Sequence, residues 1–219
     1  MFDSHAATHV RVKICGITSK TDALASIEAG ADALGFNLYP QSSRYLDLQR
    51  SADWLATLPP SVSKIAVMVN PTLEEALATA GLPFFDCLQL HGHESAGLCL
   101  RLAQARVRFA KAIPVAGDRE NIDLGNYHTA NVVLDSMADG QFGGTGRTFQ
   151  WTLARRFVDQ HPDFRVILAG GLSPQNVAEA IHAVRPFGVD VTTGVERSKG
   201  VKDHALVRSF VDAVRASAS

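Results

Sequence analysis

The stretch VKICGIT, Val12 to Thr18, is a short apolar run that ends in a cysteine, a glycine and a hydroxyl residue. An open, doubly wound α/β sheet normally carries a glycine-rich fingerprint directly after its first strand, and this chain has CGIT at that place. A cysteine at the end of a strand, beside a glycine, sits where a parallel barrel meets its ligands. The stretch therefore favours a closed barrel and makes Cys15 a candidate functional residue.

The composition is that of an ordinary globular protein of one domain. The chain has 219 residues, 46% hydrophobic and 20% charged, with a net charge of -1. This length permits one large core, and the charge lacks the basic excess of a nucleic-acid binder. Nucleic acid is therefore excluded as an expected partner.

Three cysteines, Cys15, Cys87 and Cys99, form an odd and widely spaced set without a C-x-x-C pair. Such a set argues against a disulfide framework or a zinc ribbon and fits the reducing cytoplasm. No run approaches the length that crosses a membrane, and the start does not resemble a signal peptide. We expect a cytoplasmic protein with no membrane partner, a flexible N-terminal arm over residues 1–9 and a single catalytic domain over 10–219.

Eight apolar runs of strand length alternate with helical patterns. Runs such as IAVMV and VILA are apolar on both faces, which is typical of a parallel sheet covered by helices. The predicted strands are Val10–Cys15, Ala33–Leu38, Lys64–Val69, Cys87–Leu90, Arg108–Ile113, Val132–Leu134, Val166–Ala169 and Gly188–Val191.

Amphipathic helices are predicted between these strands. Leu73, Ala76, Leu77 and Ala80 recur at helical spacing, and so do the apolar residues of 177–184. Thr72 with Glu75 forms a capping box, and Ser173 with Pro174 predicts a second helix start. Eight β-then-α units without an internal linker predict an α/β fold, a single-domain (β/α)8 TIM barrel with an eight-stranded parallel sheet.

Active sites of this fold lie at the C-terminal ends of the strands, so the residues there are the candidates. The loop after the second predicted strand contains Arg44, which could bind a carboxylate through two parallel hydrogen bonds or be a solvated loop charge. The fourth strand ends in LQLHGHE, where His91 and His93 form an H-x-H pair. A metal site would need further ligands that are not evident, so His91 is expected to act as a hydrogen-bonding group.

Asp135 follows the apolar run VVL at the end of the sixth predicted strand. A carboxylate in that position is costly unless it is paired or used, although it could also cap a turn. The glycine-rich stretch DGQFGGTGRT that follows departs from a Walker A loop, and we expect it to be a mobile loop that covers the substrate.

Two glycine-bearing stretches, AGGLSPQN and DVTTGVE, follow the seventh and eighth predicted strands. Barrels commonly bind phosphate in these two loops, through backbone N–H groups and a helix N-terminus. Tight turns would explain either stretch alone but explain both less well. We therefore predict a phosphate site formed by Gly171, Gly194, Thr192 and Thr193.

Blocks spread along the whole chain resemble the phosphoribosylanthranilate isomerase (TrpF) family of tryptophan biosynthesis. They are KICGIT, DALASIEAGADALGF, SSRY, LQLHG, LDS with GGTGRTFQW, AGGLSPQN, and GVDVTTGVE with GVKD. Two small departures are threonines in place of the commoner serines before Gly194, and Lys199 where a proline often precedes Gly200.

The resemblance implies an isomerase that performs the Amadori rearrangement of N-(5-phosphoribosyl)anthranilate to 1-(2-carboxyphenylamino)-1-deoxyribulose 5-phosphate, without metal or cofactor. It makes Cys15 the general base and Asp135 the general acid, with Arg44 on the anthranilate carboxylate and the two glycine loops on the phosphate. Asp190, at the end of the eighth strand, is expected to orient the substrate or its neighbours. Cys15 must act as a thiolate, which calls for a lowered pKa or for help from the charge of the substrate iminium.

Two alternative functions are another sugar-phosphate isomerase and a binding protein without catalytic activity. The histidine-pathway isomerase of the same reaction type would be expected to have an aspartate in place of Cys15. A catalytically silent barrel that binds a sugar phosphate as a sensor or partner subunit would not need both Cys15 and Asp135. Oligomeric state cannot be read from the sequence, and a monomer is preferred over a homodimer.

Overall fold

The computed structural model describes residues 9–114, 124–135 and 151–217. Of the predicted N-terminal arm only His9 is among the described residues, and the predicted substrate-covering loop, 139–148, lies outside them.

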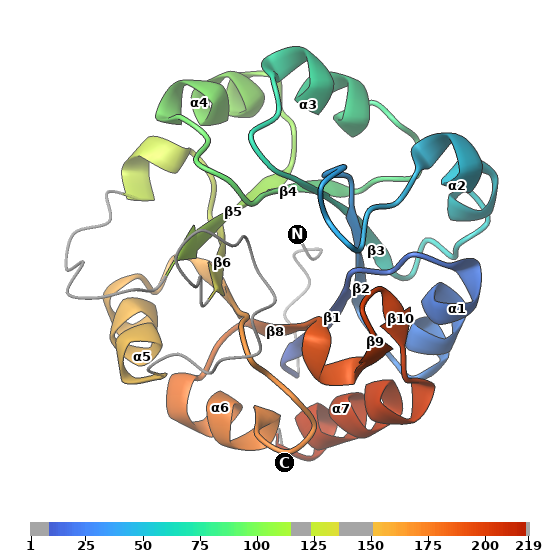
Figure 1. Ribbon diagram of the computed structural model, residues 1–219. Helices are drawn as coiled ribbons and strands as arrows, with labels where there is room; N and C mark the ends of the chain where they lie inside the picture. The colour runs from blue at the N-terminus through green and yellow to red at the C-terminus, as the bar shows by residue number, and fades with distance from the viewer. Residues whose placement is uncertain (1–8, 115–123, 136–150, 218–219) are drawn as a thin grey trace.

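Eight parallel strands form a closed barrel, as predicted, and Figure 1 shows them as an inner ring surrounded by helices. Each strand pairs with its neighbour in sequence, and β8 pairs with β1 to close the ring. The strands are β1 (Arg11–Cys15), β2 (Ala33–Asn37), β3 (Ser63–Met68), β4 (Cys87–Leu90), β5 (Phe109–Pro114), β6 (Asn131–Asp135), β7 (Arg165–Leu168) and β8 (Gly188–Val191).

The described residues contain seven α-helices, which cover the outside of the barrel in Figure 1. The capping box predicted at Thr72 and Glu75 is present, with the Thr72 hydroxyl accepting from Glu75 N and the Glu75 carboxylate accepting from Thr72 N. The helices are α1 (Lys20–Glu28), α2 (Leu48–Leu55), α3 (Leu73–Ala80), α4 (Ala96–Gln104), α5 (Trp151–Gln160), α6 (Val177–Val184) and α7 (His204–Ala216).

The connection from β5 to β6 departs from the expected eight β-then-α units. Its described part contains only the short 3₁₀ helix η1 (Leu124–Tyr127). The α6 helix also begins at Val177, later than the Ser173-Pro174 signal predicted. The Asn176 side chain accepts a hydrogen bond from Ser173 N and donates one to Gly171 O, and these bonds hold the preceding residues as a turn.

A two-stranded antiparallel hairpin, β9 (Glu196–Ser198) and β10 (Val201–Lys202), was not predicted. It follows η2 (Thr193–Val195), a 3₁₀ helix directly after β8. Figure 1 places the hairpin beside β1, next to α1 and α7. These two strands are too short to produce a hydrophobic period that a sequence pattern can reveal.

Alternation along the strands separates the core into two layers. Val12 and Ile14 of β1 face outward and pack in the layer that the helices cover, whereas Lys13 and Cys15 have the opposite parity and face the barrel interior. The apolar part of the interior is a separate cluster formed by Ala33, Ile65, Cys87, Ala110, Ala112, Val133, Ile167 and Ala169. The strand residues that point into the barrel therefore pack its interior and, at the strand ends, supply the polar groups of a site.

No α-helix in the described ranges is long and apolar enough to span a membrane.

Candidate active site

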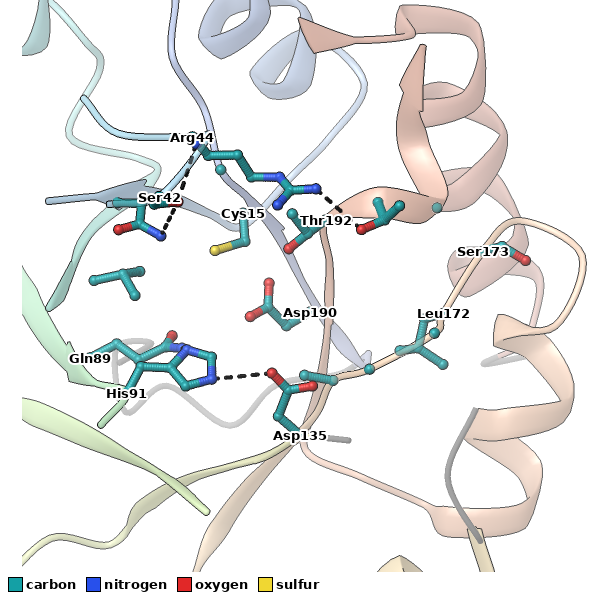
Figure 2. Close-up of a pocket in the computed structure, with 18 of the residues that line it drawn as sticks. Cys15, Ser42, Arg44, Gln89, His91, Asp135, Leu172, Ser173, Asp190 and Thr192 are labelled. Atoms are coloured by element: carbon teal, nitrogen blue, oxygen red, sulfur yellow. Dashed lines mark hydrogen bonds and ion pairs between the residues drawn. The ribbon is translucent and has the colours of Figure 1, made fainter. Parts of the chain in front are cut away.

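A cavity of about 690 Å³ lies at the C-terminal ends of the strands. Figure 2 shows Cys15 and Arg44 on one side of it, His91 and Asp135 on the other, and Asp190 between them. The structure brings all the predicted site residues together in the lining, namely Cys15, Arg44, His91, Asp135, Gly171, Asp190, Thr192, Thr193 and Gly194.

Cys15 ends β1, and its thiol is free and partly exposed to the cavity. Gly16, with φ +75°, turns the chain directly after it in a conformation that favours glycine. Burial raises the pKa of the Cys15 thiol, and the ammonium group of Lys13 acts in the opposite direction. The expectation of a lowered thiol pKa is therefore wrong, which leaves the alternative in which the charge of the substrate assists.

Asp135 ends β6 and is only 4% exposed. One carboxylate oxygen, Oδ2, lies 3.2 Å from Nε2 of His91. The other, Oδ1, is buried and has no hydrogen-bond partner among the described residues. An unpaired buried oxygen in a cavity wall is available to a ligand, because leaving it unpaired costs free energy.

His91 is oriented by a side chain that sequence reasoning did not select. The Gln89 amide nitrogen lies 3.3 Å from His91 Nδ1. When the amide donates to Nδ1, the imidazole carries its proton on Nε2, the nitrogen that faces Asp135. Gln89 is buried within the apolar run CLQL and has the interior parity of β4, which is the signal that could have identified it.

Asp190, near the end of β8, is paired with a lysine inside the barrel. Nζ of Lys13 lies 2.6 Å from Asp190 Oδ2, and the Lys13 side chain is fully buried. Asp190 Oδ1 is buried and without a hydrogen-bond partner in the described part of the chain. The sequence did contain a signal for this pair: Lys13 lies within an apolar strand, two residues before Cys15, so its side chain points to the same side as the Cys15 thiol.

Arg44 is brought to the cavity by the loop between β2 and α2, where it pairs with Glu196 of β9. The Arg44 Nε to Glu196 Oε1 and Nη2 to Oε2 distances are both 2.7 Å. Lys202 of β10 also contacts Glu196, at 3.1 Å. Arg44 is thus one member of an ion-pair network rather than a solvated loop charge, and its bonds to described residues use Nε and Nη2.

The two glycine loops lie side by side at one end of the cavity. Gly170 and Gly171 both have positive φ, at +88° and +66°. A Cβ added to Gly194 would collide with the carbonyl oxygen of Leu172, so the loops after β7 and β8 pack backbone against backbone. This contact requires glycine at 194 and brings Thr192 and Thr193 next to Gly171 in the lining.

Metal ligation is not evident in the described part of the chain, which holds no group of three or more His, Cys, Asp or Glu residues that could bind an ion. His93, the second histidine of the H-x-H pair, is exposed and precedes α4, and its backbone N–H donates to Asn70 Oδ1.

Comparison with known proteins gives a consistent assignment. The family model described as N-(5'-phosphoribosyl)anthranilate (PRA) isomerase matches residues 12–213. The enzyme of that name from Pseudomonas fluorescens is 45% identical over 208 residues, 94% of this chain and 98% of the relative. The corresponding protein from Thermotoga neapolitana is 44% identical over 203 residues, 92% of this chain and 97% of the relative.

Solved structures agree with the sequence comparison. Phosphoribosyl anthranilate isomerase from Thermotoga maritima superposes with a TM-score of 0.85 at 40% identity, covering 94% of this chain and 99% of that one. A second isomerase structure, in complex with reduced 1-(o-carboxyphenylamino)-1-deoxyribulose 5-phosphate, gives 0.82 at 39% identity with the same coverage. This chain belongs to the N-(5'-phosphoribosyl)anthranilate isomerase family.

Proposed function

We propose that the chain catalyses the Amadori rearrangement of N-(5-phosphoribosyl)anthranilate to 1-(2-carboxyphenylamino)-1-deoxyribulose 5-phosphate, a step of tryptophan biosynthesis. The observation that carries the proposal is the placement of Cys15 and Asp135 on opposite sides of one cavity, next to two adjoining glycine loops. An acid, a base and an anion site are the parts that this rearrangement needs.

Asp135 acts first, as the general acid. It donates its proton to the furanose ring oxygen, the ring C–O bond breaks, and the anthranilate nitrogen forms a Schiff base with C1′. His91, whose Nε2 lies 3.2 Å from Asp135 Oδ2, then stabilises the carboxylate that remains.

Cys15 acts second, as the general base. It removes the proton from C2′ of the sugar, and the electron pair moves toward the cationic nitrogen to give an enolamine that tautomerises to the ketone. Because burial raises the pKa of Cys15, its proton must pass to solvent under the influence of the bound substrate before the base can act. The iminium charge supplies that influence, since a nearby positive charge favours the thiolate.

Substrate binding divides between the two ends of the cavity. Arg44 faces the anthranilate carboxylate with its Nη1 side, because Glu196 occupies Nε and Nη2. The phosphate lies against Gly171 and Gly194, with Thr192 and Thr193 as hydroxyl donors. Asp190 uses its free Oδ1 to orient the sugar hydroxyl groups.

The rival histidine-pathway reaction is disfavoured by Cys15, because that isomerase is expected to have a carboxylate there. A silent sugar-phosphate sensor is disfavoured because it would not need both Cys15 and Asp135 in the wall of the cavity.

A cytoplasmic monomer remains the expected state of the protein. The three free cysteines support a reducing location. A relative from Thermotoga maritima is described as dimeric, so the preference for a monomer needs its own measurement, by light scattering on the eluting protein.

The deciding experiment follows the fluorescence of freshly generated N-(5-phosphoribosyl)anthranilate in the presence of the purified protein and EDTA. We expect the signal to disappear much faster than by spontaneous decay. Decay at the spontaneous rate would overturn the proposed function, and activity that EDTA abolishes would overturn the metal-free mechanism.

A further inference from the structure

We propose that the ammonium group of Lys13 stabilises the thiolate of Cys15 and that Asp190 holds this ammonium in position. The inference deepens the proposed function, because it rests on Cys15 acting as the base. It assigns a role to a fully buried lysine inside the barrel, a place where a lysine is rare and costly.

Lys13 and Cys15 lie on the same face of β1, two residues apart, so both side chains enter the barrel interior. The ammonium lies 2.6 Å from Asp190 Oδ2, and the Cys15 sulfur lies beside it next to Gly35. Burial alone would lower the pKa of Lys13, but the charges of Asp190 and Cys15 raise it above its ordinary value. The lysine therefore stays an ammonium ion and is a fixed positive charge beside the thiol.

The neighbouring strand leaves room for this contact. Gly35 of β2 is paired with Cys15, and a Cβ added there would lie 2.6 Å from the Cys15 sulfur and 3.0 Å from Lys13 Nζ. The absence of a side chain at Gly35 lets the sulfur and the ammonium occupy the same part of the interior.

Other charged groups also act on the thiol. Asp190 of β8 disfavours the thiolate, and Lys202 of β10 favours it. Arg44 also faces the thiol, and Glu196 pairs with both Arg44 and Lys202. Among the cations, Lys13 lowers the pKa of Cys15 most, so its loss should change the reactivity of the thiol most strongly.

Substitutions of Lys13 and Asp190 should change the reactivity of Cys15 in opposite directions, which makes the test specific. Without Lys13 the thiolate loses its counter-charge. In Asp190→Asn the amide oxygen can still accept the hydrogen bond from Lys13, so the ammonium keeps its position while the thiolate loses the repulsion by a negative charge. If the Lys13–Asp190 pair only supported the fold, both substitutions would loosen the barrel and change the reactivity of Cys15 in the same direction.

The experiment measures the rate at which iodoacetamide alkylates Cys15 at a fixed pH near neutrality, with the site of modification read by peptide mass spectrometry. That rate reports the thiolate fraction, and a change of one pKa unit changes the fraction about tenfold. We expect Lys13→Met to react about tenfold more slowly than the wild type and Asp190→Asn to react faster.

Lys64→Met is the matched control, because Lys64 is also buried and paired, with Asp86, but lies near the opposite end of the barrel at the start of β3. Its alkylation rate should equal that of the wild type. If Lys13→Met does not fold, the double variant Lys13→Met/Asp190→Asn is compared with Asp190→Asn, and it should be slower.

A rate unchanged by the loss of Lys13, or accelerated by both single substitutions, overturns the inference. In turnover, the rising limb of kcat/KM with pH should move to higher pH in the Lys13 variant, because kcat/KM reports the base of the free enzyme. Alkylation needs no substrate, so an inactive wild-type protein would overturn the proposed function without changing the alkylation result.

Discussion

The thiol of Cys15 lies in surroundings that raise its pKa. Burial is the main cause of its raised pKa, and the nearby cations reduce the effect without reversing it. A thiol with a raised pKa has little thiolate at neutral pH and so offers little to unrelated electrophiles.

Replacing Cys15 by alanine should lower kcat by a factor of roughly 100 or more, as loss of a general base usually does. The folded state should change little, because Cys15 is only partly buried at the end of its strand. The measurement is steady-state turnover of N-(5-phosphoribosyl)anthranilate, with thermal unfolding as the check on the fold. Wild-type turnover in this variant would remove Cys15 from the mechanism.

Asp135→Asn should reduce kcat comparably, by about 100-fold, because an amide cannot donate the proton that opens the furanose ring. The amide keeps the shape of the carboxyl group next to His91, so KM is expected to change less than kcat. The rate should be followed with the fluorescence assay, and an unaffected rate would exclude Asp135 as the acid.

At the scale of elements, the β9–β10 hairpin has a role that no sequence pattern indicated. It presents Glu196 and Lys202 to the barrel mouth, and Glu196 fixes the guanidinium of Arg44 from a position 152 residues away in the chain. The strands could be predicted because the hydrophobic pattern is read from each segment separately. The candidate residues could be predicted because active sites of this barrel lie at the C-terminal ends of its strands. The Arg44–Glu196 pair could not, because it depends on how a hairpin of three and two residues packs beside β1.

Removing the side chain in Arg44→Ala should mainly raise KM, by roughly 10- to 100-fold, the range expected for loss of a charge-assisted hydrogen bond. A smaller effect on kcat is expected, because the anthranilate carboxylate is bound equally in the ground and transition states. Steady-state kinetics separates the two parameters. A variant with reduced kcat and unchanged KM would show that Arg44 acts on the reacting atoms instead.

The substitution Glu196→Gln tests whether the hairpin positions Arg44. Burial alone would raise the pKa of Glu196, but Arg44 and Lys202 hold it below its ordinary value, so the side chain is a carboxylate. With the charge removed, Arg44 is held less firmly, and KM should rise several-fold while kcat changes less. A lower KM would show instead that Glu196 competes with the substrate for Arg44. Arg50→Gln, which removes an exposed ion pair with Asp47, is the control and should change neither parameter.

At the scale of the whole molecule, Asp32 ties the start of the barrel to its last helix. Its carboxylate accepts hydrogen bonds from Val12 N and Arg11 Nη1 at 2.8 Å, and from Arg215 Nη2 of α7 at 2.9 Å. The sequence could not reveal this arrangement, because its members come from β1, the loop before β2 and α7, at opposite ends of the chain.

Replacing Asp32 by asparagine should destabilise the protein by about 2 kcal/mol, since charged hydrogen bonds are lost at a largely buried site. For a chain of this size that corresponds to a fall in Tm of about 4–8 °C. Asp159→Asn, which affects an exposed ion pair within α5, should change Tm little.

The effect of Asp32→Asn should also depend on pH. Burial alone would raise the pKa of Asp32, but the bonds from Val12, Arg11 and Arg215 hold it below its ordinary value. The stabilisation by Asp32 is therefore complete above the unfolded-state pKa of about 3.9 and is lost as pH falls through the lower folded-state pKa. Thermal unfolding of both proteins should show the difference in Tm at neutral pH and its disappearance in acid.

The pairing of β1 with β8 has a consequence for the order in which activity arises. β1 contributes Cys15 to the cavity lining and β8 contributes Asp190, so neither the first nor the second half of the barrel holds the complete cavity. A nascent chain cannot form this cavity until β8 has left the ribosome and the ring can close.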